Sequence, residues 1–123
     1  MYDVFMRLQT DTKALVLSVL ANGPKHGYGI AKAIRENSDG ALKLGEGQLY
    51  PALHALEEEG WVVAEWEAVG EQSKRIYSIT PAGSEELVRR AARWNAFANG
   101  VAKILPTSPL VAEVNSCRNL MHI

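Results

Sequence analysis

The sequence has little of the chemistry that builds covalent or metal-bound sites. Its single cysteine, Cys117, cannot close a disulfide within the chain, and its three histidines lie far apart, without the spacing of metal ligands. We also find no phosphate-binding loop and no nucleophile with a neighbouring base. The sequence therefore predicts no metal site and no cofactor, and it argues against an enzyme.

Long hydrophobic runs are missing too. No segment approaches the roughly 20 apolar residues that cross a bilayer. The first ten residues lack the apolar region and the cleavage site of a secretion signal. A hydrophobic content of 47% still suffices for a packed core, and 123 residues fit one domain. We expect a small cytoplasmic protein without a membrane partner.

The chain has no excess of positive charge, because its formal net charge is −1. The charges are nevertheless segregated. Residues 57–71 hold six acidic side chains and no basic one, and Lys74 and Arg75 follow directly. The distribution of charge, rather than its sum, decides whether one face can attract nucleic acid. A positive face is therefore possible, although the sequence alone does not establish one.

Two segments near the N-terminus have the apolar spacing of helices. The first begins near Thr10, with Asp11 as the expected N-cap, and ends at Gly23. The second covers residues 25–40. Its expected apolar face holds Tyr28, Ala31 and Ile34.

A third helix is predicted over roughly residues 46–59. Leucines at positions 49, 53 and 56 recur at spacings of four and three, which makes a narrow apolar stripe. Gly60 is suited to end this helix, and Pro51 should bend it or loosen its first turns. The consecutive carboxylates Glu57, Glu58 and Glu59 point in different directions on a helix. We therefore expect them to form a solvated helix end rather than a catalytic site.

The spacing then changes from helical to extended. Residues 61–67 and 75–80 are rich in β-branched and aromatic side chains, and the segment between them contains Gly70, which indicates a hairpin turn. Tyr77 and Ile79 should anchor the hairpin on the helices, because a two-stranded hairpin is unstable alone. Trp61 and Trp66 are interpreted as packing residues of the hairpin.

The last helix begins at Pro81, with Thr80 as its N-cap. Inside it, apolar residues follow spacings of 4, 3, 4, 3 and 4, which is typical of a helix that meets a partner helix along its length. The predicted dimerisation residues are Leu87, Ala91, Trp94, Ala98, Val101 and Leu105.

Three helices, a hairpin and a further helix is the order of elements in a winged helix-turn-helix protein, whose recognition helix enters the major groove of DNA. We therefore predict a mainly α fold with a small β-hairpin (α+β). Residues 1–80 form the DNA-binding domain, 81–105 the dimerisation helix and 106–123 a C-terminal extension. The candidate DNA contacts are Gln48, Tyr50, Pro51 and His54 of the third helix, with Ala52 beside them, and Lys74 and Arg75 near the wing tip.

Three motifs resemble the PadR family of transcription regulators. They are HGYGIAKAI at 26–34, GEGQLYPALHALEEEGWV at 45–62 and IYSITPAG at 76–83. The resemblance covers about residues 10–105, and it implies a dimeric repressor of a kind that often responds to aromatic compounds. Two positions depart from the family pattern: Gly45 stands where a serine cap is common, and Lys74-Arg75 replaces a longer basic run.

We expect a ligand-responsive repressor that binds a pseudo-palindromic operator in double-stranded DNA as a homodimer. Trp94 is the candidate contact for a flat aromatic effector, as the resemblance implies, although it could equally pack the dimer interface. Simpler interpretations also exist for Tyr50, as a half-buried aromatic, and for Lys74-Arg75, as a solvated pair. The alternative function is a winged-helix protein-interaction module without DNA binding, which the mildly acidic composition favours.

Overall fold

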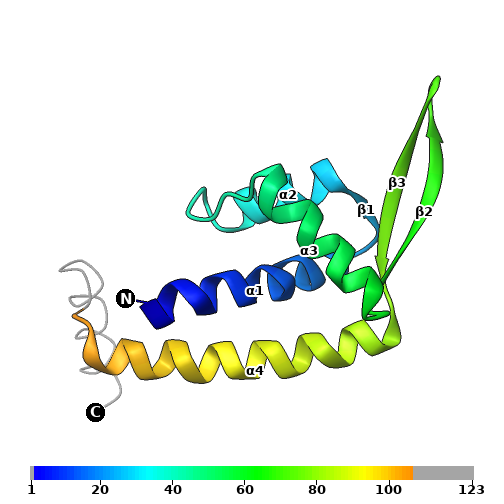
Figure 1. The fold of residues 1–123 in the computed structure, drawn as a ribbon. Coiled ribbons are helices and arrows are strands. Elements are labelled where there is room, and N and C mark those ends of the chain that lie inside the picture. Colours follow the sequence, from blue (N-terminus) through cyan, green and yellow to red (C-terminus); the bar gives the residue numbers. More distant parts are fainter. Residues whose placement is uncertain (1, 107–123) are drawn as a thin grey trace, which may run out of the picture. The chain divides into compact units, whose positions relative to one another are not determined.

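The computed structural model describes residues 2–106, with side chains from Asp11 onwards. Four helices and a small antiparallel sheet follow one another along the chain, so the predicted mainly α fold with a hairpin is confirmed (Figure 1). The elements are α1 (Tyr2–Leu20), β1 (Lys25–His26), α2 (Gly27–Asn37), α3 (Glu46–Glu58), β2 (Val62–Val69), β3 (Gln72–Ile79) and α4 (Pro81–Ile104). The predicted extension over 106–123 lies outside the described residues, apart from Pro106.

The core lies between α1, α2, α3 and the base of the sheet. The predicted stripe of α3 turns into it, and Leu49, Leu53 and Leu56 are buried. Tyr77 of β3 joins the same cluster and Ile79 packs against it, so the wing is anchored as expected. The other buried members are Val16, Leu17, Val19, Leu20, Ile30, Ile34 and Val62.

Two local predictions are wrong at the N-terminal side. Helix α1 begins at Tyr2, so Asp11 lies inside it and is not its N-cap. A capping side chain contributes only about 1 kcal/mol, which does not end a helix whose preceding residues continue it. Lys25 and His26 are not helical either. They form β1, a third strand that pairs antiparallel with Tyr77 and Ile76 of β3.

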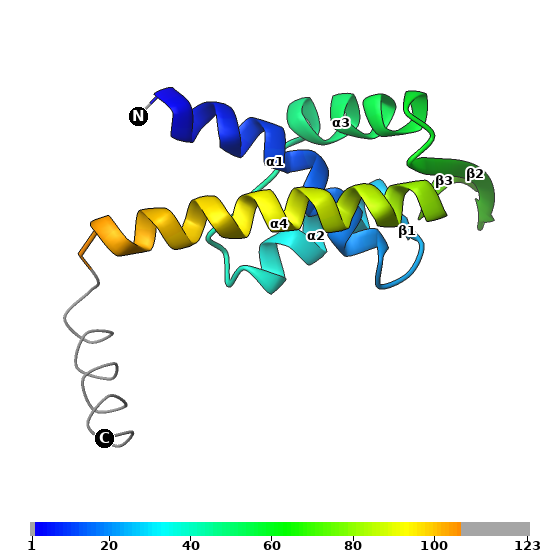
Figure 2. The same ribbon diagram turned by 90° about the horizontal axis from the view of Figure 1, so that it is seen from below.

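The hairpin is longer and its turn is tighter than the sequence indicated. The pairing of β2 with β3 runs without interruption from Val62↔Ile79 to Val69↔Gln72. Only Gly70 and Glu71 remain for the turn, and Gly70 has a φ of 64°. Glycine in the left-handed region at the first turn position is typical of two-residue hairpins. Two views of the molecule both show the hairpin extending away from the C-terminal end of α3 (Figures 1 and 2).

The ends of α3 and α4 meet in a network of backbone bonds. Helix α3 ends at Glu58 with Glu59 as its C-cap, and Gly60 follows in the predicted role with a φ of 77°, while the amide of Trp61 donates to the carbonyl of Leu56. Thr80 caps α4 as predicted: its hydroxyl accepts a bond from the Gly83 amide and donates to the Gly60 carbonyl. A Cβ at position 83 would lie 2.1 Å from the Trp61 carbonyl oxygen, so only glycine fits there.

The chain divides into two compact units, and α4 crosses the boundary between them. The first unit ends at Ala91 and contains the winged-helix elements with the first turns of α4. The second begins at Ala92, and there the rings of Trp94 and Phe97 lie 5.5 Å apart. Within residues 2–106, no helix is long and apolar enough to span a membrane.

Candidate nucleic-acid interface

Helix α3 presents one polar, exposed face outside the core. Gln48, Tyr50, Pro51 and His54 are all exposed, as the sequence predicted. Ala52 is not, because it is buried beside Leu53, so the expectation that it faces outward is wrong. The apolar stripe is thus one residue wider than leucine spacing alone suggested. These four side chains lie on the exposed face of α3, which also carries Glu58, four residues after His54.

Tyr50 has a fixed place on this face, because its ring lies over the first residue of α2. A Cβ at Gly27 would lie 2.7 Å from the Tyr50 hydroxyl oxygen and 3.2 Å from two ring carbons. Gly27 therefore gives the ring room to lie close to the backbone of α2. This close approach is the structural reason for a glycine at that position of the motif.

An open groove of about 350 Å³ separates the starts of α2 and α3 from the wing. Two aromatic side chains on it are more exposed than expected. Tyr28 is 74% exposed, although the sequence placed it on the apolar face of its helix, and Trp66 is 71% exposed, although it was interpreted as a packing residue. The groove is lined by His26, Gly27, Tyr28, Tyr50, Trp66, Ser73, Lys74, Arg75 and Tyr77, none of which carries a carboxylate.

The strand register sorts the charges of the wing onto two faces. Side chains alternate along a strand, so Trp66 and Arg75 share one face, whereas Glu67 and Lys74 share the other. Glu65 has the same parity as Glu67, and both acidic residues of β2 therefore lie on the Lys74 face. The face of Trp66 and Arg75 carries no acidic strand residue. Lys74 of the other face also lines the groove, and Oε1 of Glu67 lies 3.6 Å from Nε2 of His26, another lining residue. Two carboxylates of the acidic run, those of Glu57 and Glu67, thus contact lining residues of the groove, although neither lines it itself.

Arg75 contacts three side chains of its own chain. Its Nη2 donates to Oε1 of Glu57 over 2.6 Å, and its guanidinium lies 5.9 Å from the ring centre of Trp66 and 5.6 Å from that of Tyr77. Burial raises the pKa of the Tyr77 hydroxyl, an effect that the positive charge of Arg75 partly offsets. Lys74, by contrast, is exposed near the wing tip.

Glu57 is not part of a solvated helix end, contrary to the sequence-based expectation. Its side chain is only 21% exposed, and its second oxygen lies 3.6 Å from Nδ1 of His54. One carboxylate therefore contacts a residue of the exposed α3 face and a residue of the wing. No sequence signal indicated this contact, because the partners are 18 positions apart and in elements of different period.

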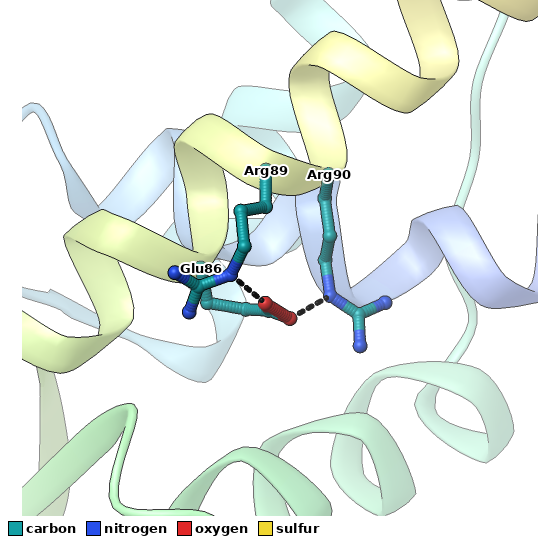
Figure 3. A network of polar contacts seen from close by, with 3 residues as sticks. All are labelled: Glu86, Arg89 and Arg90. Carbon is teal, nitrogen blue, oxygen red and sulfur yellow. Dashed lines mark hydrogen bonds and ion pairs between the residues drawn. The ribbon is translucent and has the colours of Figure 1, made fainter.

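A second charged network holds the first turns of α4. Oε1 of Glu86 accepts a bond from Arg89 and Oε2 accepts one from Arg90, each over 3.0 Å (Figure 3). The Arg90 guanidinium also lies 5.5 Å from the Trp61 ring centre. Burial raises the pKa of the Glu86 carboxyl, but the bonds and charges of the two arginines outweigh it and hold the pKa below its usual range.

The predicted dimerisation residues differ in their surroundings. Leu87 packs against the core of its own unit, so it is already covered in the single chain. Ala91, Trp94, Ala98 and Val101 are partly exposed, and Leu105 is 60% exposed. Among residues 11–106, no group of three or more histidine, cysteine or acidic side chains is placed to hold a metal ion.

Known sequences similar to this chain include a transcriptional regulator and an uncharacterised protein. A family model described as Transcriptional regulator PadR-like family matches residues 16–89. The Mycobacterium tuberculosis transcriptional regulator Rv3488 is 37% identical over 62% of this chain and 70% of its own length. An uncharacterised 37.1 kDa protein in transposon TN4556 of Streptomyces fradiae is 46% identical over 66% of this chain, but the match spans only 22% of that protein.

Solved structures share the fold. A transcriptional regulator from Clostridium thermocellum covers 86% of this chain and 98% of its own, with a TM-score of 0.75 and 26% identity. Bacillus subtilis PadR in complex with operator DNA covers 80% of this chain and 49% of its own, with a TM-score of 0.57 and 23% identity. The arrangement of helices and wing and the family model, which spans more than half of the sequence, agree: the chain belongs to the PadR-like family of transcriptional regulators, which are not enzymes.

Proposed function

We propose that this protein represses transcription in the cytoplasm as a homodimer that binds double-stranded DNA through α3 and the wing. The observation that carries the proposal is the exposed face of α3, which stands beside a groove whose lining has no carboxylate. Such a helix fits the major groove, while the wing reaches the adjacent backbone or minor groove. That the similar Bacillus subtilis PadR was solved with operator DNA supports this assignment.

The proposed contacts divide by chemistry. Gln48 can bond a base edge, and Tyr50 can donate its hydroxyl to a phosphate. Pro51 and His54 complete the exposed face, and Lys74 supplies a cation at the wing. Arg75 remains a candidate from the sequence, but its ion pair with Glu57 favours a role in the frame of the wing rather than on DNA.

DNA binding is tested by selecting duplexes from a random pool with the full-length protein and titrating the best one at several salt concentrations. Binding should saturate and weaken as salt rises, because phosphate contacts release counterions. Replacing Lys74 with alanine should lower the salt slope by about 0.9 for one lost contact. Lys103→Ala, an exposed lysine in the last turn of α4, is the matched control. If no duplex is enriched and no salt-sensitive binding occurs, the protein acts instead as a protein-interaction module.

The proposal also includes a homodimer formed through α4 and an aromatic effector that binds at Trp94. The apolar heptad of α4 supports a partner helix on the face of Ala91, Trp94, Ala98 and Val101, whose side chains are only partly covered in the single chain. A flat aromatic molecule that stacks on Trp94 would release the DNA. Titration with a panel of planar aromatics should quench the fluorescence of the wild type but not that of Trp94→Ala. Equal quenching in both proteins, or none in either, argues against this site.

A further inference from the structure

The ion pair between Glu57 and Arg75 is a side-chain contact between the proposed recognition helix α3 and strand β3 of the wing. The base of the hairpin packs in the core through Val62 and Tyr77, and Glu67 of β2 lies 3.6 Å from His26 of β1, but the outer part of the hairpin is uncovered. Strand β1 pairs with β3 only at Ile76 and Tyr77, and all residues over 65–74 are exposed. A two-stranded hairpin is at best marginally stable alone. Contacts at its base therefore determine its direction relative to α3.

The surroundings of this pair make it a firm contact. The guanidinium of Arg75 lies 5.9 and 5.6 Å from the ring centres of Trp66 and Tyr77 and bonds the Glu57 carboxylate. The side chains of Arg75 and Glu57 are 34% and 21% exposed. Removal of one partner would leave the other charge half-buried and uncompensated, which is costly. An Arg75 side chain turned toward DNA would leave Glu57 in that state.

We infer that Glu57 is a positioning residue for DNA binding, and that Arg75 holds the wing rather than a phosphate. The inference rests on the proposed function. Glu57 fixes the angle between α3 and the wing, so that helix and wing reach one duplex together. The other oxygen of the same carboxylate, 3.6 Å from His54 Nδ1, also restrains a side chain of the exposed α3 face.

This role predicts an effect of unusual sign. An acidic side chain near a polyanion should oppose binding, so its neutralisation should strengthen the complex if Glu57 acts only through its charge. If Glu57 positions the wing, the same substitution weakens the complex. The direction of the change therefore separates the two roles.

The experiment uses the full chain and two duplexes of equal length, the one selected by the wild type and an unrelated one. Glu57→Gln should weaken binding to the selected duplex by about tenfold or more. Affinity for the unrelated duplex should change little, because it depends on the number of phosphate contacts rather than their register. Glu58→Gln, an exposed neighbour with the same change in charge, is the control and should bind as tightly as the wild type or slightly more tightly. Unchanged or tighter binding of Glu57→Gln to the selected duplex would overturn the inference.

Variants of Arg75 test the second half of the inference. Arg75→Gln should weaken selective binding by a factor similar to that of Glu57→Gln, and the double variant should be no weaker than either single one, because both remove the same contact. The salt slope should stay at the wild-type value in all three. A slope that falls by about 0.9 in Arg75→Gln would identify Arg75 as a phosphate contact and contradict the inference.

Two further measurements distinguish possible failures. Far-UV circular dichroism and the melting temperature show whether each variant is folded at the temperature of the titration, and Glu57→Asp, which keeps the charge on a shorter side chain, should recover part of the lost selectivity. If the wild type itself does not bind DNA, the proposed function fails. If the wild type binds selectively and Glu57→Gln matches it, only the positioning role fails.

Discussion

The first turns of α4 and its remaining length belong to one continuous helix, yet they differ in what covers them. Near the N-terminal end, Gly83 and Glu86 are buried, and Leu87 packs against the core of the first unit. From Ala92 to Ile104 no side chain is buried in the single chain, and Ile104 is 83% exposed. The first part is thus completed by its own chain. The second part carries an apolar heptad that the single chain leaves uncovered, which supports the proposed dimer.

The largest effect on stability is expected at Gly83, which lies in the covered first part of α4. A methyl group there would meet the Trp61 carbonyl oxygen at 2.1 Å and Ile79 at 2.9 Å. Backbone atoms cannot move aside as a flexible side chain does, so α4 must shift or the Thr80 cap must break. Gly83→Ala should lower the free energy of unfolding by about 3 kcal/mol, as measured by urea denaturation. A loss below about 0.5 kcal/mol would show that this junction is loosely packed.

The second part should respond in its association rather than its fold. Val101→Asp would place a carboxylate on the proposed helix-to-helix seam and should weaken self-association by about 100-fold, or about 2.7 kcal/mol. Sedimentation equilibrium measures the change. Ala96→Asp adds the same charge on the side of the heptad opposite the seam, where the residue is exposed, and should leave the dimer intact. If both variants dimerise equally well, the heptad is not the interface.

The stabilising effect of Glu86, in the first part of α4, should depend on pH. Its pKa is lowered in the folded protein, so the network stabilises the fold above the unfolded value near 4.3, and this contribution is lost as the pH falls through the folded value. Glu86→Gln should cost about 2 kcal/mol at pH 7, because it leaves Arg89 and Arg90 facing a neutral amide. The difference from the wild type should shrink below about pH 4. The exposed neighbour serves as control: Glu85→Gln should be near neutral at both pH values. A penalty for Glu86→Gln that stays constant with pH would contradict the charged network.

Local patterns predicted most of the winged-helix unit. Leucine spacing identified α3 and its buried stripe, and Thr80-Pro81 marked the start of α4. What they missed depends on contacts distant in sequence. Strand β1 has two residues, too few for any periodicity, and it exists because β3 offers a free edge about 50 positions later. The miss at Asp11 is local instead: the residues before it continue the helix, so its capping preference did not mark the start of α1.

The candidate site, like the fold, was predictable only where it depends on local spacing. The exposed side chains of α3 follow from the position of its apolar stripe, so Gln48, Tyr50 and His54 could be identified from spacing. The ion pair of Glu57 could not, because it depends on the angle between a helix and a hairpin. Alternation along the strands, counted from the buried Tyr77, places Arg75 and Trp66 on the face toward α3. That parity was available in the sequence once the turn was known to contain only two residues.

The smallest effect is expected at Gly100. The same substitution as at Gly83, glycine to alanine, should here raise the stability rather than lower it. A Cβ at Gly100 would meet nothing within 4 Å in the single chain, and its heptad position lies away from the proposed seam. Alanine restricts the unfolded chain and favours the helix, so Gly100→Ala should stabilise the protein by about 0.5–1 kcal/mol. Urea denaturation at fixed protein concentration measures the gain, and amide hydrogen exchange along α4 shows whether it is local to the second part. Destabilisation, or a change in the dimer constant, would mean that a partner packs closely on this side of α4. The proposed seam would then have to turn toward Gly100 and away from Ala91 and Ala98.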